Sequence, residues 1–396
     1  VQRRKRRTKQ QSNQYRRHLM GNKLIIAILA SLAFISTAFA DDMGDGEKKP
    51  FEISGDFSGS MMFHDNEGNR SNTVGLNPHD EFNINLVEIN LAKNWSKSSL
   101  NLSIGYGSTA TAVNPLINPL TAAPANTLNL MHAYYSLMSD YGLQFMFGKW
   151  EAPFGMEHYN QRENAQFTRS YGFQLTPFFQ TGLGLNYNGG MWDAGFIVSN
   201  GQGLGNDTKD NNKTMAVTGG INPMEQLAID VNYITGTEGS GAAAPFTNNE
   251  ISVLDVNVAY MLNEMLDFAL NYTDRGTKAD TAGAKDLKAN SVAAYANAHF
   301  GMFGLGLRYE TFSYDGGVLL ANNLTTASFG ANGITGSDNS INSITLAAKA
   351  EIDQNATVIL EYRMDSSDDK IWNDKETPAT ATDSQNTITL GMMYQF

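Results

Sequence analysis

The strongest constraint in this sequence is a two-residue alternation of apolar side chains, repeated about sixteen times between Phe51 and Phe396. A period of two indicates β-strands with one apolar face. The alternating runs match the roughly 9–11 residues that a tilted membrane-spanning strand needs. The sequence therefore predicts an all-β fold, a transmembrane antiparallel β-barrel of about 16 strands (about 14–18, because patterns place strand ends loosely).

A soluble sandwich also alternates, so two further features matter. The apolar phases contain no Asp, Glu, Lys or Arg, and aromatic side chains stand at many run ends, as an interfacial girdle requires. No stretch after residue 40 has 18 consecutive apolar residues, which argues against a helical membrane span. Both features favour the barrel.

Two runs need comment. The run at 81–93 changes phase, with Leu86 expected on the face of Ile84, which indicates a β-bulge or a misplaced strand. In the run that starts at Met131, we expect Met131, Ala133 and Tyr135 to share one face.

The connections between runs alternate in length. Short turns are expected near 94–97, 139–140, 188–189, 222–223, 263–264, 300–301 and 353–354, and long loops at 64–80, 107–126, 150–180, 200–212, 237–249, 274–288, 314–340 and 366–385. This alternation fits sixteen antiparallel strands with both termini in the periplasm. Long loops are usually functional. We expect the third long loop, 150–180, to fold into the bore and set its width.

The first fifty residues are expected to lie outside the barrel. Residues 20–40 resemble a secretory signal peptide, with Lys23, an apolar stretch and an Ala38-Phe39-Ala40 exit, so we expect cleavage after Ala40. A membrane anchor is the alternative, but the apolar stretch is shorter than the ~20 residues of a span. Residues 1–19 form a basic extension, either a start-site artefact or a nucleic-acid-binding arm. Residues 41–50 form a polar leader.

Charge and cysteine content exclude some classes. Residues 1–40 hold nine of the 28 Lys and Arg and none of the 40 Asp and Glu, so the rest has a net charge of −21. This argues against nucleic acid as a partner. The chain has no cysteine and therefore no disulfide or thiol chemistry.

The chain ends on an alternating run, TITLGMMYQF, whose last residue is Phe396. This run resembles the terminal strand signal that the barrel assembly machinery of the outer membrane recognises. An ordinary edge strand that happens to end in Phe is the alternative.

Two segments resemble a known family. FGKWEAPFGME at 147–157 resembles the G-K-[FW]-x-x-P-[FILV]-G-x-E segment of OmpL-like outer-membrane beta-barrel porins (the porin-2 group), and also the related phosphate-selective porin O/P type. FTRSYGF at 167–173 and PFFQTG at 177–182 look closer to the OmpL-like group. The resemblance implies passive diffusion of small hydrophilic solutes, without a cofactor. In general porins the third external loop narrows the channel.

Charged side chains are expected on the lumenal phase and in the third loop. The acids on the lumenal phase are Glu52, Asp56, Asp193, Asp230, Asp255, Asp267, Glu310, Glu351 and Glu361, and the bases are Arg308, Lys349 and Arg363. This excess of acids departs from the basic lumen of a phosphate-selective porin and favours a weak cation preference. Pore-constriction residues are expected to be Lys149, Glu151, Glu157, Arg162, Glu163 and Arg169, with a solvated loop of locally paired charges as the alternative.

Other sites have weaker support. The histidines show no metal-ligand spacing, and no residue pattern marks a nucleophile, so we expect neither a metal site nor an enzyme. Five acids in loop 366–385 could hold divalent ions that bridge lipopolysaccharide, or be simply solvated.

The sequence predicts an outer-membrane porin of a Gram-negative bacterium that allows passive diffusion. Its partners would be lipid, lipopolysaccharide, small solutes or ions, and in a trimer two further copies. The alternative is a structural or adhesive barrel with a loop-closed pore.

Overall fold

A computed structural model describes most of the expected barrel. The described residues are 51–65, 81–113, 128–201, 212–238, 249–279, 285–315, 339–373 and 381–396. The expected signal peptide, basic extension and polar leader lie outside them, as do parts of several long loops. No helix in the described part is long and apolar enough to cross a membrane.

Sixteen strands form one closed antiparallel barrel, as the alternation predicts. They are β1 (Glu52–His64), β2 (Phe82–Asn94), β3 (Ser98–Tyr106), β4 (Asn129–Met138), β5 (Leu143–Glu151), β6 (Phe179–Asn188), β7 (Trp192–Ser199), β8 (Thr214–Met224), β9 (Leu227–Glu238), β10 (Asn249–Met261), β11 (Leu266–Lys278), β12 (Leu287–Phe300), β13 (Phe303–Tyr314), β14 (Asn339–Glu351), β15 (Ala356–Ser367) and β18 (Ser384–Gln395). Short elements in the connections are α3 (Ser108–Val113), the 3-10 turns η1 (Gln161–Glu163) and η2 (Gly172–Leu175), and the two-stranded sheet of β16 (Trp372–Asn373) and β17 (Ala381–Thr382).

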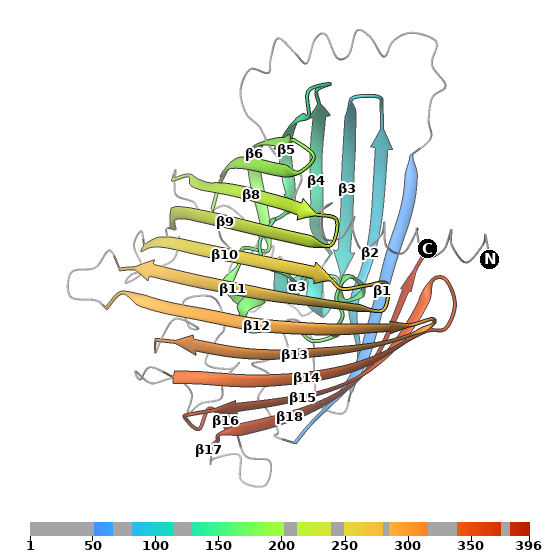
Figure 1. The fold of residues 1–396 in the computed structure, drawn as a ribbon, viewed down its shortest axis with the longest axis vertical. Helices are drawn as coiled ribbons and strands as arrows, with labels where there is room; N and C mark the ends of the chain where they lie inside the picture. Colours follow the sequence, from blue (N-terminus) through green and yellow to red (C-terminus); the bar gives the residue numbers. More distant parts are fainter. Residues whose placement is uncertain are drawn as a thin grey trace.

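The barrel is a meander in which each strand pairs with the next along the chain (Figure 1). The first and last strands close it: Phe57 pairs with Tyr394, and the backbone N–H of Gly55 donates to the carbonyl of Phe396 at 3.1 Å. Closure leaves no unpaired strand edge, so backbone polar groups of all sixteen strands are satisfied within the sheet.

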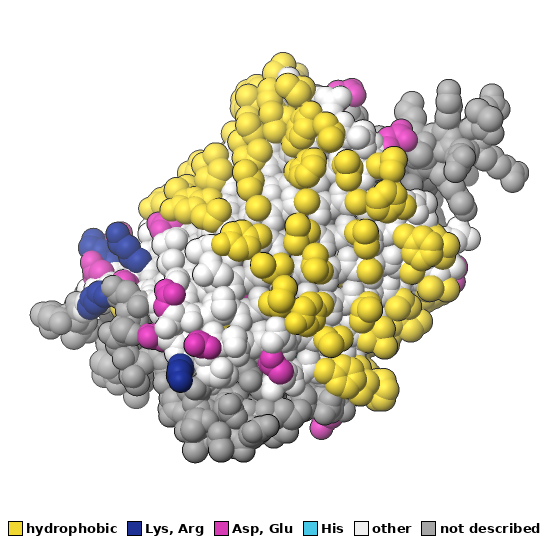
Figure 2. Space-filling model, turned by 60° about the horizontal axis from the view of Figure 1, so that its bottom comes forward, with side chains coloured by type: hydrophobic (Ala, Val, Ile, Leu, Met, Phe, Trp, Pro, Cys, Tyr) yellow, Lys and Arg dark blue, Asp and Glu magenta, His cyan; other side chains and the backbone are white. Residues whose placement is uncertain are grey.

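The alternation separates the two faces of each strand. On β11 the outward Phe268, Leu270 and Tyr272 are exposed, whereas the inward Asn271 and Thr273 are buried. Figure 2 shows hydrophobic side chains spread in a broad band over one face, with charged side chains gathered outside the band. An apolar outer band and a polar interior are what a lipid-spanning barrel requires.

Two bulges correct the expected phases. The pairing of β1 with β2 shifts at Ser58/Gly59, which confirms a bulge in the run 81–93. Because the extra residue is Asn85, Leu86 turns inward and is fully buried, contrary to our expectation. A second shift, between β3 and β4 at Ser103/Ile104, turns Met131 inward to 0% exposure, so its expected lipid-facing position was wrong.

Two connections also differ from expectation. Asn222 and Pro223 lie inside β8, which ends at Met224, so this turn comes three residues later than predicted. The sixth long loop is shorter than expected, because β11 extends to Lys278 and β12 begins at Leu287. Strands that protrude beyond the apolar band carry polar residues outward, which hides their ends in the sequence.

Candidate pore interior

The connection between β5 and β6, residues 152–178, crosses the inside of the barrel; we call it the bore segment. The N–H of Gly155 donates to Asp255 on β10 at 3.0 Å, and the hydroxyl of Tyr159 donates to Glu88 on β2 at 2.8 Å. These strands lie eight places apart in a ring of sixteen, on opposite sides. Gly155 and Tyr159 therefore contact opposite walls, and the segment crosses the bore between them. The four residues from one to the other span at most about 14 Å.

Two wall carboxylates bind the main chain of the bore segment. Glu361 on β15 accepts the N–H groups of Phe167 at 2.6 Å and Thr168 at 3.1 Å. Glu310 on β13 accepts the N–H groups of residues 171–172 at 2.9 and 2.8 Å. Both carboxylates are buried, and charged acceptors make short, strong hydrogen bonds. These contacts fix the segment by its backbone.

Four wall cations bind carbonyl groups of the same segment. Arg308 donates to the carbonyl of Thr168 at 2.8 Å, and Arg363 donates to that of Arg169 at 2.6 Å. Arg275 donates to the carbonyl of Leu175 at 3.0 Å, and Lys349 donates to that of Asn164. Backbone carbonyls in a loop have no ladder partner, and each must find another donor when buried. The wall supplies these donors from β11, β13, β14 and β15.

A buried ion pair joins the centre of the bore segment to the wall. Arg308 lies 2.5 Å from Glu157, and both are almost fully buried. Glu157 also accepts the N–H and hydroxyl of Ser170, at 2.7 and 2.5 Å. Arg169 donates to the carbonyls of His158 (3.0 Å) and Tyr159. These bonds join two stretches of the bore segment that lie about ten residues apart in the sequence. Burial lowers the pKa of Arg169 to about 10, although Glu157 acts in the opposite direction.

Asp255 holds the start of the bore segment. It is fully buried and accepts from Asn257 at 2.5 Å, Asn271 at 2.8 Å and Thr273 at 3.1 Å as well as from Gly155. Gly155 has φ +80°, a left-handed conformation that glycine adopts without strain. The Pro153–Gly155 stretch therefore makes a sharp bend at the start of the bore segment.

Apolar packing holds the bore segment against several parts of the wall. Each of the four buried apolar clusters in the described residues contains side chains of this segment or its ends: Tyr171 and Leu175 with β12–β14; Tyr159, Phe173, Phe178 and Phe179 with β2, α3 and β4; Trp150, Ala152 and Phe154 with β7–β10; and Phe167 with β1, β14, β15 and β18. A barrel of sixteen strands is too wide to fill with wall side chains alone. The bore segment supplies the missing core.

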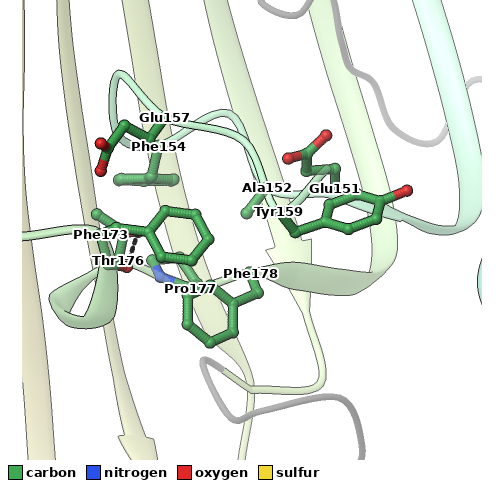
Figure 3. A pocket seen from close by; sticks show the side chains of 9 residues that line it. All are labelled: Glu151, Ala152, Phe154, Glu157, Tyr159, Phe173, Thr176, Pro177 and Phe178. Carbon is green, nitrogen blue, oxygen red and sulfur yellow. Dashed lines mark hydrogen bonds between the residues drawn. The ribbon is translucent and has the colours of Figure 1, made fainter. Parts of the chain in front are cut away.

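A small recess lies within the bore segment, close to its two ends (Figure 3). The rings of Phe173 and Phe178 stack at 4.7 Å and line one side. In Figure 3 the carboxylate of Glu157 points away from these rings, and Glu151 lies on the far side beside Tyr159. The recess therefore has a mixed lining of apolar rings and polar groups.

The six expected constriction residues divide into two groups. Lys149, Glu157 and Arg169 are buried, with Lys149 Nζ 5.3 Å above the ring of Phe179. Glu151, Arg162 and Glu163 are only half-buried. Glu151 lies 3.3 Å from His158. The structure thus brings three of the six into anchoring contacts and leaves three partly open to the bore.

The expected lumenal residues lie on the inward phase of their strands. Those that are buried are Asp230, Asp255, Asp267, Arg308, Glu310, Glu361 and Arg363, while Asp193 and Lys349 are half-buried and Glu351 is exposed. Five of them, together with Lys349, hold the bore segment or its neighbours as described above. Asp267 instead contacts His299 at 2.8 Å and Asn297 at 2.7 Å.

Sequence reasoning missed three inward charges. Glu88 follows the bulge in β2, which shifted its apparent phase. Arg275 and Asp365 lie in strand ends that were assigned to loops, and both are buried. Strict alternation continued through 275 and 365 would have found the last two. The phase change in 81–93 could have found Glu88, because it lies between the apolar residues Val87 and Ile89.

Metal binding finds no support in the described residues, which contain no group of three or more His, Cys, Asp or Glu side chains able to hold an ion. His132, for example, forms a hydrogen bond with the hydroxyl of Tyr159 at 3.0 Å.

A closed sixteen-strand barrel with an apolar outer band and a long segment in its bore has the architecture of an outer-membrane porin. Solved structures agree on the fold. OmpT of Vibrio cholerae is 11% identical with a TM-score of 0.58 (89% of this chain, 100% of that chain), and the anion-selective porin of Comamonas acidovorans is 11% identical with 0.57 (88% and 99%). OmpF of Salmonella typhi, in complex with daunomycin, is 11% identical with 0.56 (88% and 98%).

The family model described as beta-barrel porin-2, OmpL-like, matches residues 50–396. The chain belongs to this family, as the motifs at 147–182 indicated. Family and fold together define an outer-membrane barrel of a Gram-negative bacterium, consistent with a diffusion channel rather than an enzyme. A search of curated proteins finds no match.

Proposed function

We propose that this protein is a passive-diffusion porin with a weak preference for cations. The observation that carries the proposal is a porin-family barrel whose inward phase is rich in acids. The missed residues Glu88, Asp365 and Arg275 add two acids and one base to the sequence-based count. An acidic lumen raises the local concentration of cations.

The residues proposed to set the constriction follow from exposure. Among the six residues, Glu151 at the end of β5 and Arg162 and Glu163 of the bore segment remain half-exposed. Lys149, Glu157 and Arg169 would act by shaping the segment, because their charges are buried against the wall or the segment itself. All six residues would thus contribute to the constriction, three by facing the passage and three by shaping the segment.

A second candidate function is a structural or adhesive barrel whose pore is closed. The observation that favours it is the packing of the bore segment into all four buried clusters. In this case the segment would act as a plug.

Several partners belong to the same proposal. They are lipopolysaccharide at the outer leaflet, the barrel assembly machinery acting on the last strand to Phe396, and two further copies in a trimer. Export would depend on a signal peptide cleaved after Ala40.

Bilayer conductance of the purified barrel tests the proposal. Discrete steps with a reversal potential shifted toward cation selectivity across a potassium chloride gradient are the expected result. Anion-selective steps would retain the porin and overturn the cation preference. If folded protein gave no conductance steps, the proposal of a plugged structural barrel would replace that of a porin.

A further inference from the structure

The connection between β15 and β18 enters the bore at Ile371 and Trp372. These side chains are 3% and 0% exposed, although they belong to a connection rather than to the wall. We call residues 367–373 the strap. In Figure 1 its short strand β16 lies beside the ends of β14 and β15. A fully buried tryptophan in such a connection must have a partner inside the barrel.

Hydrogen bonds fix the start of the strap on β14. The hydroxyl of Ser367 donates to the side-chain oxygen of Asn339 at 3.1 Å, and the N–H of Asp368 donates to the carbonyl of Ser340 at 3.2 Å. The hydroxyl of Ser340 in turn donates to the carboxylate of Asp368. The strap therefore begins at a defined height on the wall.

Beyond this point, Trp372 joins the bore segment to the wall. It belongs to one buried cluster with Tyr171 and Leu175 of the bore segment and with Phe312 and Ile341 of β13 and β14. The rings of Tyr171 and Phe312 stack with centroids 5.3 Å apart. A tryptophan buries about 150–250 Å² of mostly apolar surface. It is the largest side chain in this cluster.

The contacts of the bore segment make this cluster consequential. Glu310 and Arg363 bind the main chain around Tyr171, at the start of the η2 turn. Apolar packing restricts the turn further, because close-packed apolar contacts tolerate little displacement. Tyr171 precedes η2 and Leu175 is its last residue, and Trp372 belongs to the cluster that holds both.

We infer that Trp372 is a positioning residue, and that the strap holds the η2 turn of the bore segment against β12–β14 and so fixes the width of the passage. The inference rests on the porin function proposed above. It means that a connection outside both the wall and the bore segment limits the size of the solutes that can pass.

The test compares unit conductance and liposome swelling with sugars of increasing size for wild type, Trp372→Ala, Trp372→Phe and Trp192→Ala. Trp192 is 49% exposed on the outward phase of β7, which makes it a matched control. Trp372→Ala is expected to increase unit conductance and admit larger sugars, Trp372→Phe to restore wild-type values, and Trp192→Ala to change neither. Folded Trp372→Ala barrels with wild-type conductance and size limit would overturn the inference.

A silent wild type separates the two proposals. It would overturn the porin function, and Trp372→Ala would then decide the strap alone: steps in the variant support it, and silence overturns it. If Trp372→Ala does not fold, Ile371→Ala takes its place, with the same outcomes.

Thiol labelling provides an independent measurement. The chain has no cysteine, so Ile371→Cys creates a single thiol. Slow labelling in the folded barrel and fast labelling when combined with Trp372→Ala or after unfolding would support a strap packed in the bore. Fast labelling of the folded Ile371→Cys barrel would overturn it.

Discussion

Two sides of the bore hold the same segment by different chemistry. On the β13–β15 side, charged side chains such as Arg308 and Glu361 bind its backbone and the carboxylate of Glu157. On the β7–β10 side, most of the contact is apolar: Trp150, Ala152 and Phe154 pack with Ile197, Ala216, Ile234 and Val253, and Asp255 accepts the N–H of Gly155. The first side thus holds the segment mainly by its backbone, and the second mainly by its side chains.

The difference assigns different roles to charges that look alike in the sequence. Charges on the β13–β15 side have partners in the bore segment, so their main effect is on its position. On the other side, Asp193 and Asp230 flank Gly220, where a Cβ atom would collide with both carboxylates. These two aspartates lie near the short turns, away from the anchoring network. We expect them to act on passing ions.

Breaking the buried pair should have the largest effect. Arg308→Met leaves Glu157 as an uncompensated buried charge, and such losses cost about 3–5 kcal/mol. The variant should unfold at a lower temperature in detergent, measured by heat-modifiable gel mobility. Arg308→Met combined with Glu157→Gln should recover part of the stability. If Arg308→Met were as stable as wild type, the charged contacts on the β13–β15 side would not anchor the segment as proposed.

Neutralising the opposite side should alter selectivity instead. Asp193→Asn with Asp230→Asn removes two inward charges near the short turns, and the reversal potential in a salt gradient should shift toward anions. Stability should change by less than about 0.5–1 kcal/mol, since the amides retain the shape of the carboxylates. Glu361→Gln is the matched control, with the opposite expectation of reduced stability and unchanged selectivity. An unshifted reversal potential in the double variant contradicts the proposed role.

The smallest expected effect concerns His158, where the bore segment leaves the apolar side. Burial lowers the pKa of His158, but the carboxylate of Glu151, 3.3 Å from Nδ1, outweighs it, so the net direction is raised. The folded state therefore binds the proton more tightly than the unfolded state. The resulting stabilisation is complete below the unfolded pKa of about 6.5 and is lost as pH rises through the folded pKa.

Unfolding free energies of wild type and His158→Gln, measured across this window, check the prediction. The advantage of wild type should fall as pH increases. A difference that stays constant or grows with pH would show that the pair does not titrate as the contact implies.

The barrel itself could be predicted because its rule is local. Each outward side chain must match lipid and each inward one must not, so a period of two appears in every strand. The prediction failed where the rule was broken locally. The bulge at Asn85 turned Leu86 inward, and the shift at Ser103 turned Met131 inward. The phase change in 81–93 indicated the first bulge but not that Leu86 turns inward, and the run that starts at Met131 showed no phase change.

The interior could be predicted only in part. The sequence identified the bore segment and most inward charges, since both follow from spacing. It could not pair them, because partners such as Thr168 and Glu361 are 193 residues apart and meet only when the barrel closes. For the same reason, nothing in the sequence connected Trp372 with Tyr171.

The sequence by itself thus determined the strand count, the direction of most side chains and the segment that enters the bore, because lipid and water act on each residue separately. The tertiary structure decided which inward charges anchor that segment and which lie away from it. It also decided that a connection near the end of the chain packs against the segment. These outcomes depend on distances across a closed barrel, and only its closure sets them.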